Sequence, residues 1–158
     1  MKEFGTLAEM ALHLGVMEKA VEHQLRHGLG VVASAIQKTA KEEIGHYQRM
    51  TGPFAAWAPL AESTKEERKR LGYTPDDPGL RSGEMRESIQ KNVGAREAVV
   101  GSDDQHLVYF ELGTDKQPPR SVLGMAVIRN RELIEKELGR AVVRGITGSD
   151  PIGGNYDF

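Results

Sequence analysis

The sequence predicts an α+β fold with a long N-terminal helix, a small antiparallel β-hairpin, a C-terminal amphipathic helix and an extended C-terminal tail. Apolar residues recur at helical spacing over residues 7–47 and again over residues 123–142. Between these stretches, Val93 precedes and Ala98, Val99 and Val100 follow a turn at residues 94–96, which predicts a hairpin of two short strands. We expect the hairpin to pack against the C-terminal helix.

The chain is expected to form one α+β domain over residues 1–148. Residues 1–50 supply a long helical segment, and residues 54–148 supply the core. From Gly145 the chain is rich in Gly, Ser, Asp, Pro and Asn, and residues 149–158 end in Tyr156, Asp157 and Phe158. Such a tail is expected to be a flexible arm, or an arm whose aromatic residues dock on a neighbouring subunit.

Composition excludes several classes of function. The 158 residues carry a net charge of −2, so no overall positive charge attracts nucleic acid. The absence of cysteine excludes disulfides and thiolate metal sites. We find no basic leader and no apolar run of about 18 residues, and therefore expect a soluble protein that has no secretion signal and no membrane contact. We also expect no cofactor.

The N-terminal helical stretch begins with a capping box, in which Thr6 caps the helix and Glu9 follows three residues later. The pattern fits either one helix or two helices in tandem, and Gly28 and Gly30 mark the expected break or kink. A helix of this length cannot bury its apolar stripe within so small a domain. We therefore expect part of the stripe to contact another subunit.

Two histidines on this helix, His23 and His27, have the i, i+4 spacing of metal ligands in zinc proteases. Gln24 stands where the general-base glutamate of those enzymes would be, so the water-activating carboxylate is absent. The histidines are interpreted as exposed or interface residues. A metal-dependent hydrolase that uses His23 and His27 is kept as an alternative hypothesis.

The segment after the first helix is interpreted as an irregular stretch anchored on the core by Trp57. Ser63 and Thr64 each precede a glutamate by three residues, which predicts a helix that starts at one of them and ends before Gly72. Residues 65–70 of this helix are rich in Lys and Arg interleaved with Glu. They are expected to form a solvated face; a small DNA-binding regulator is the alternative that uses them.

Local signals also place the shorter elements. Ser82 is expected to cap a short helix before the hairpin. Asp103 or Asp104 is expected to cap a helix over residues 106–112, and Gly113 is expected to end it.

The stretch from Tyr109 to Leu123 is predicted to be a structural corner. Pro118 and Pro119 stiffen the crossing between two helices. Glu111 has no partner that general acid–base chemistry would need, so we predict no catalytic residue here. An ion pair between Glu111 and Arg120 across the turn is our hypothesis. The candidate structural and assembly residues are Trp57, Tyr109, Glu111, Gly113, Thr114, Pro118, Pro119, Arg120, Tyr156 and Phe158.

Five short motifs follow one another in order: Trp57-Ala58-Pro59-Leu60-Ala61 with Ser63-Thr64, then Leu80-Arg81-Ser82-Gly83-Glu84-Met85-Arg86-Glu87-Ser88-Ile89, Val100-Gly101-Ser102, Tyr109-Phe110-Glu111-Leu112-Gly113-Thr114, and Pro118-Pro119-Arg120 with Leu123. Their order and spacing resemble the tailed-phage virion morphogenesis family, which comprises tail-completion and neck proteins. The resemblance covers residues 57–144.

This resemblance implies a virion structural protein without enzymatic activity. Such a protein would form an oligomeric ring in the head–tail connector of a tailed phage, a prophage or a phage-like particle, and would join the capsid portal complex to the tail. A hexamer is favoured and a dodecamer is possible. The expected partners are other copies of the chain, other connector and tail proteins, and DNA that passes through the channel without specific binding. The expected location is the virion, after assembly in the host cytoplasm.

Overall fold

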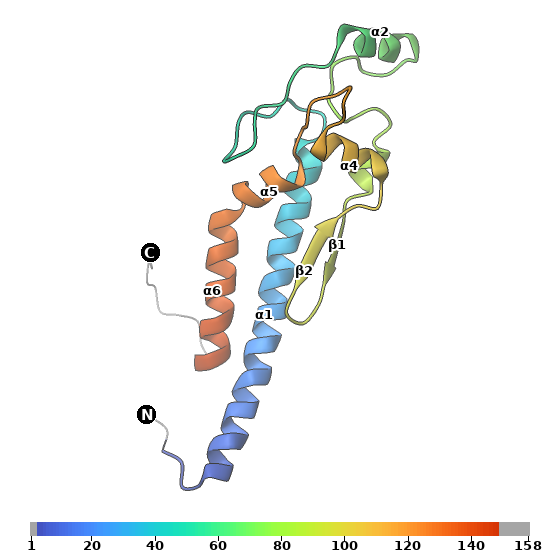
Figure 1. The fold of residues 1–158 in the computed structure, drawn as a ribbon. Coiled ribbons are helices and arrows are strands. Elements are labelled where there is room, and N and C mark those ends of the chain that lie inside the picture. The colour runs from blue at the N-terminus through green and yellow to red at the C-terminus, as the bar shows by residue number, and fades with distance from the viewer. Residues whose placement is uncertain (1–2, 149–158) are drawn as a thin grey trace. The chain divides into compact units, whose positions relative to one another are not determined.

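A computed structural model describes residues 3–148 of the chain, and its fold is α+β, as the sequence predicts. The predicted arm at residues 149–158, with Tyr156 and Phe158, lies outside the described residues. The elements are helices α1 (Leu7–Glu43), α2 (Glu62–Arg70) and α3 (Glu84–Glu87), strands β1 (Gln90–Val93) and β2 (Ala98–Gly101), and helices α4 (Gln105–Leu112), α5 (Leu123–Arg129) and α6 (Arg131–Thr147) (Figure 1).

The chain divides into two compact units, and the helix α1 and the hairpin contribute residues to both. The first unit comprises the described parts of Met1–Val32 and Glu132–Phe158 together with Val93–Ala98. The second unit comprises Ala33–Asn92 and Val99–Arg131.

Helix α1 begins where the capping box predicts. The backbone N–H of Glu9 donates to Thr6 Oγ1 over 3.2 Å, and the Glu9 carboxylate accepts from the N–H of Gly5 over 2.9 Å. The helix then continues over 37 residues, so of the two alternatives the single helix is confirmed. Gly28 and Gly30 do not interrupt it.

Gly28 has a packing role in the first unit. A Cβ atom at Gly28 would lie 3.2 Å from the carbonyl oxygen of Glu137, and a Cβ atom at Gly145 would lie 2.4 Å from Val21 Cα. These two contacts place the C-terminal part of α6 nearer the N-terminus of α1, so the two helices run antiparallel (Figure 1). A Cβ atom at position 145 would collide with the α1 backbone, and one at position 28 would make a contact tighter than an ordinary van der Waals contact.

The hairpin forms with the predicted turn. Strands β1 and β2 make a two-stranded antiparallel sheet, and the N–H of Gly94 donates to the Glu97 carbonyl over 2.8 Å. At its tip, Arg96 lies 2.9 Å from Glu22 and 3.4 Å from Glu18. We expected the hairpin to pack on the C-terminal helix, but these ion pairs tie its tip to α1.

The continuous C-terminal helix predicted from residue 123 onward is instead two helices. The break falls at Asn130, whose side-chain amide donates to Thr39 Oγ1 over 2.9 Å and to the Ala126 carbonyl over 2.8 Å. The Ala126 carbonyl also accepts from the N–H of Asn130 over 3.2 Å, so the amide shares an acceptor at the end of α5, and its bond to Thr39 ties this end to α1.

Two start signals need correction. Helix α2 begins at Glu62, after Ala61, which makes no side-chain cap, so Ser63 and Thr64 lie inside the first turn. Helix α3 follows Gly83, and the Ser82 hydroxyl accepts only a long bond of 3.4 Å from the N–H of Glu84. The predicted stop before Gly72 is confirmed, since Gly72 has a φ of +80°.

The core of the second unit combines the C-terminal third of α1 with α4, α5 and the irregular segments. Its most buried apolar side chains come from elements distant in sequence, so the unit depends on long-range contacts. They are Ala33, Ile36, Ala40, Ile44, Trp57, Ile89, Leu107, Phe110, Val122, Met125 and Ala126.

Among residues 3–148, no helix combines the length and the apolar character that crossing a bilayer requires.

The close approach of α6 to α1 yields a prediction. Gly145→Ala should lower the free energy of unfolding by about 1–2 kcal/mol, because the new methyl group overpacks against the Val21 backbone. Gly139→Ala, on the same helix with nothing within 4 Å of its Cβ position, should raise it by up to about 1 kcal/mol. Chemical denaturation of both variants checks this; stabilisation by both would contradict the packing of α6 on α1.

Candidate functional site

The candidate site lies in the second unit, at the corner that connects α4 to α5. Helix α4 begins at Asp104, whose carboxylate accepts from the N–H of His106 over 2.9 Å, as the sequence predicts. This backbone hydrogen bond and the His106 side chain lower the pKa of Asp104. The helix ends at Gly113, which has a φ of +76°. A Cβ atom there would lie 2.7 Å from the backbone nitrogen of Pro119, so the chain doubles back on itself at a point that only glycine fits.

The loop between the two helices is closed by its own hydrogen bonds. Thr114 and Gln117 form an antiparallel bridge, and the Gln117 side chain donates to the Tyr109 carbonyl over 2.7 Å. The N–H of Arg120 donates to the Phe110 carbonyl over 2.8 Å. The loop thus returns residue 120 to a fixed place beside α4.

Glu111 is the centre of this corner. One oxygen of its carboxylate accepts from the N–H of Val122 over 2.6 Å and from the N–H of Leu123 over 2.9 Å. The other accepts from the Ser121 hydroxyl over 2.6 Å and from the N–H of Gly124 over 3.1 Å. Glu111 therefore caps the N-terminus of α5 from the preceding helix, where a negative charge also interacts favourably with the helix dipole.

The predicted ion pair between Glu111 and Arg120 is wrong. The Arg120 guanidinium donates to the Ala58 carbonyl over 2.9 and 3.1 Å and to the Pro59 carbonyl over 3.2 Å. It lies 5.7 Å from the centroid of the Phe110 ring. Arg120 is 4% exposed, and this burial lowers its pKa. Backbone N–H groups at the start of α5 donate to the Glu111 carboxylate, whereas Arg120 donates to carbonyl groups of a different segment.

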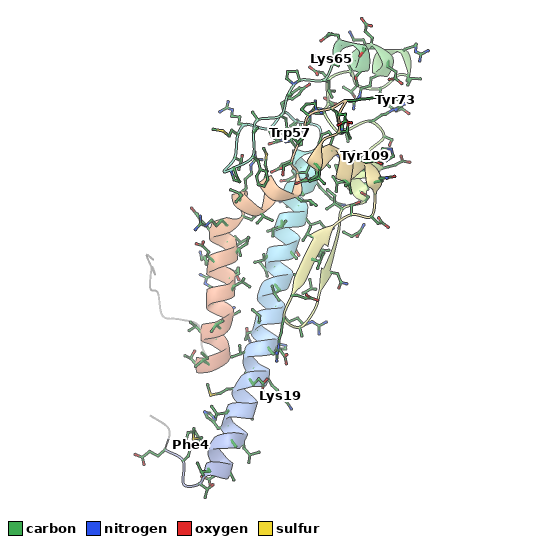
Figure 2. The ribbon with its side chains drawn as sticks, viewed as in Figure 1. Phe4, Lys19, Trp57, Lys65, Tyr73 and Tyr109 are labelled. Atoms are coloured by element: carbon green, nitrogen blue, oxygen red, sulfur yellow. The ribbon has the colours of Figure 1, made fainter. Side chains whose placement is uncertain are left out.

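Trp57 fastens that same segment to the corner. Its indole N–H donates to the Ser121 carbonyl over 3.1 Å, and its ring meets the Phe110 ring edge-on at 5.2 Å between centroids. Figure 2 labels Trp57 and Tyr109, which both belong to the second unit. The expected anchor role of Trp57 agrees with its burial.

The remaining candidate residues of the corner lie at the surface. Tyr109 is exposed, and its hydroxyl accepts from the Gln105 side chain. Thr114, Pro118 and Pro119 are exposed and line an open depression with the rest of the loop. These residues offer contact surface, whereas Glu111, Arg120 and Trp57 hold the corner together.

A buried pair that sequence reasoning missed lies in the same unit. Glu43, at the end of α1, is 2% exposed, and its Oε1 lies 2.9 Å from Arg129 Nη1. Its Oε2 is buried and accepts no hydrogen bond from the described residues. Burial raises the pKa of Glu43 to about 7, the Arg129 charge opposes the increase and the Glu111 charge adds to it. No local pattern distinguishes Glu43 from the exposed glutamate beside it.

The residues of the two alternative hypotheses are exposed or contact other residues of their own unit. His23 and His27 are exposed on α1, and within residues 3–148 no group of three or more potential metal ligands occurs. In α2, Lys65 lies 3.2 Å from Glu62 and 3.3 Å from Asp76. Arg68 is buried and donates to the Asp77 carbonyl over 2.6 Å.

Comparison with known proteins gave no match to any protein-family model, to any curated protein or to any solved structure. The family resemblance thus depends on the sequence motifs alone.

The cap formed by Glu111 predicts a large loss of stability when the carboxylate is removed. Glu111→Ala should lower the free energy of unfolding by about 3 kcal/mol, because three backbone N–H groups and a hydroxyl lose their acceptor. Glu111→Gln should lose less, since one amide oxygen still accepts. Glu66→Ala, which removes an exposed glutamate of α2, is the control and should change stability little. Equal losses in the Glu111→Ala and Glu66→Ala variants, measured by denaturant titration, would contradict the capping role.

The buried Glu43 predicts a pH dependence of stability. The pKa of its carboxyl is 4.5 in the unfolded chain and about 7 in the fold, so the folded state holds the proton more tightly. Stability should therefore fall by about 3 kcal/mol as pH rises from about 4.5 to about 7, and level off above that.

Glu43→Gln should abolish this part of the pH dependence, because the amide cannot ionise. Glu42→Gln, which alters an exposed neighbour whose carboxylate lies 3.8 Å from Lys38, should leave it unchanged. Thermal denaturation across this pH range distinguishes the two variants. A pH dependence of Glu43→Gln identical to that of the unchanged chain would show that Glu43 is not its source.

Proposed function

We propose that this chain is a non-enzymatic virion structural protein, a subunit of an oligomeric ring in the head–tail connector of a tailed phage, a prophage or a phage-like particle. In this role it joins the portal complex of the capsid to the tail and surrounds the channel through which DNA passes. The favoured assembly has six copies, and twelve copies is the alternative. Its partners are then other connector and tail proteins.

The observation that carries the proposal is the ordered motif set, together with the way in which three of its motifs meet. Arg120 of the Pro118-Pro119-Arg120 motif binds the carbonyl groups of Ala58 and Pro59. Trp57 contacts Phe110 of the motif that contains Glu111. Residues that the resemblance selects from three separate stretches thus form one corner, which supports a shared structural role for them.

The surface chemistry is compatible with a ring around DNA. A net charge of −2 gives the chain no overall attraction for phosphate groups, which suits a channel that must release the DNA it conducts. Ring assembly also needs repeated contacts between identical subunits. Apolar side chains are available for such contacts, including the exposed Tyr109 and Leu112 of α4.

The alternatives have weaker support from particular contacts. A DNA-binding role for residues 65–70 would compete with the ion pairs of Lys65 and the buried position of Arg68. A hydrolase that uses His23 and His27 would need a third ligand from elsewhere.

The proposal predicts that the chain is a component of assembled particles. Deleting its gene from the source genome should yield capsids and tails that fail to join, and supplying the full chain in trans should restore joined particles. Electron microscopy of lysates measures the joined fraction, and mass spectrometry of purified particles detects the chain. Normally joined particles in the deletion strain, or particles without the chain, would overturn the proposal.

A further inference from the structure

A seam with heptad spacing, which is apolar at its first five positions, runs along α1. It consists of positions 7, 10, 14, 17, 21, 24 and 28, which follow one another at alternating intervals of three and four residues. Residues so spaced lie along one face of a helix and form the contact line of coiled coils. The positions hold Leu7, Met10, Leu14, Met17, Val21, Gln24 and Gly28.

Within the first unit, α6 lies against the C-terminal part of this seam. Gly145 faces Val21, and Gly28 faces Glu137. Because the helices run antiparallel and α6 ends at Thr147, two residues after Gly145, the contact ends near Val21. Figure 2 shows that the turns of α1 between Phe4 and Lys19 extend past the end of α6.

Three of the four seam residues beyond this point are strongly exposed for apolar side chains, and the fourth, Met17, is half-buried. Leu7 is 86% exposed, Leu14 50% and Met10 43%. The same line of side chains that packs against α6 therefore continues toward the N-terminus, where no helix of the first unit lies against it among residues 3–148.

We propose that residues 7–17 of α1 are a self-association surface, on which the same segment of a second copy of the chain packs. The inference deepens the proposed function, and rests on it in so far as that function requires copies to associate. It specifies which surface they use. The second copy packs on the exposed part of the seam in the way that α6 packs on the covered part.

The charges of this segment favour an identical partner. Glu9 is its single charged residue among Asp, Glu, Lys and Arg, and it lies on another face of the helix, away from the seam. Ala11 and His13 flank the seam, so two copies approach without opposing Asp, Glu, Lys or Arg side chains.

A lipid surface fits this segment less well. Helices that lie at a membrane interface carry Lys and Arg on their polar face, and residues 7–17 contain neither. The segment therefore lacks the basic residues that would hold it against anionic headgroups.

The test compares two pairs of substitutions in the full chain. Met10→Gln with Leu14→Gln alters the seam, whereas Leu12→Gln with Val16→Gln alters equally apolar residues on the opposite face, which are 73% and 67% exposed. The seam variant should weaken self-association by more than about tenfold, and the opposite-face variant should not. Sedimentation velocity across a concentration series measures the effect, and circular dichroism verifies that both variants stay helical.

Cross-linking provides a second measurement, because the chain contains no cysteine. Oxidation should join copies that carry Leu14→Cys if the helices are parallel, or mixtures of Leu14→Cys with Met10→Cys if they are antiparallel. Copies that carry Leu12→Cys should not be joined. A full chain that stays monomeric at every concentration, or equal effects of the two pairs of substitutions, would overturn the proposal.

The outcomes also separate this inference from the proposed function. Seam-dependent association of a chain that is missing from particles would leave the surface valid and remove the virion role. If the chain is found in particles but the seam substitutions do not change its self-association, the virion role stands and the proposed surface is wrong. Binding to anionic vesicles without self-association would overturn the inference in favour of a lipid surface.

Discussion

The second unit depends above all on the carboxylate of Glu111, which accepts four hydrogen bonds at the start of α5. The first four N–H groups of any α-helix lack partners within the helix, and burying them unsatisfied is costly. Glu111, which belongs to α4, accepts from the first two N–H groups of α5 and from the N–H of Val122 just before them. It thereby fixes the distance between the two helices. The loop of residues 113–119 can then take one conformation, which returns Arg120 to the carbonyl groups of Ala58 and Pro59.

Two buried or half-buried carboxylates of this unit thus have opposite surroundings. Glu111 is surrounded by hydrogen-bond donors, and hydrogen bonds to a charged carboxylate are stronger than those to a neutral group. Glu43 has Arg129 on one oxygen and no described donor on the other, so burial disfavours its charge and raises its pKa to about 7. The charge of Glu111 adds to that increase. Stabilising the start of α5 with a fixed negative charge therefore adds to the cost of ionising Glu43.

Local signals explain what the sequence could predict, and long-range contacts explain what it could not. The capping box at Thr6, the cap at Asp104 and the stop at Gly113 each involve residues within a few positions, and the structure agrees with them. The break at Asn130 involves Thr39, 91 residues away, and Arg120 binds carbonyl groups about 60 residues earlier. The hypothesis of a Glu111–Arg120 pair failed because it considered the two charges and left out the backbone N–H groups that compete for the carboxylate.

The uncovered part of the α1 seam is suited to association because it is already ordered when a partner arrives. An isolated helix of about eleven residues is marginal in water, since its first turn is costly to form. Residues 7–17 instead extend a helix of 37 residues whose other end is packed in the second unit and whose middle is held by α6. Association then costs little backbone conformational entropy. More of the free energy gained by burying Leu7, Met10 and Leu14 therefore contributes to affinity. The close α1–α6 packing that glycine permits at positions 28 and 145 would in this way also support contact between copies.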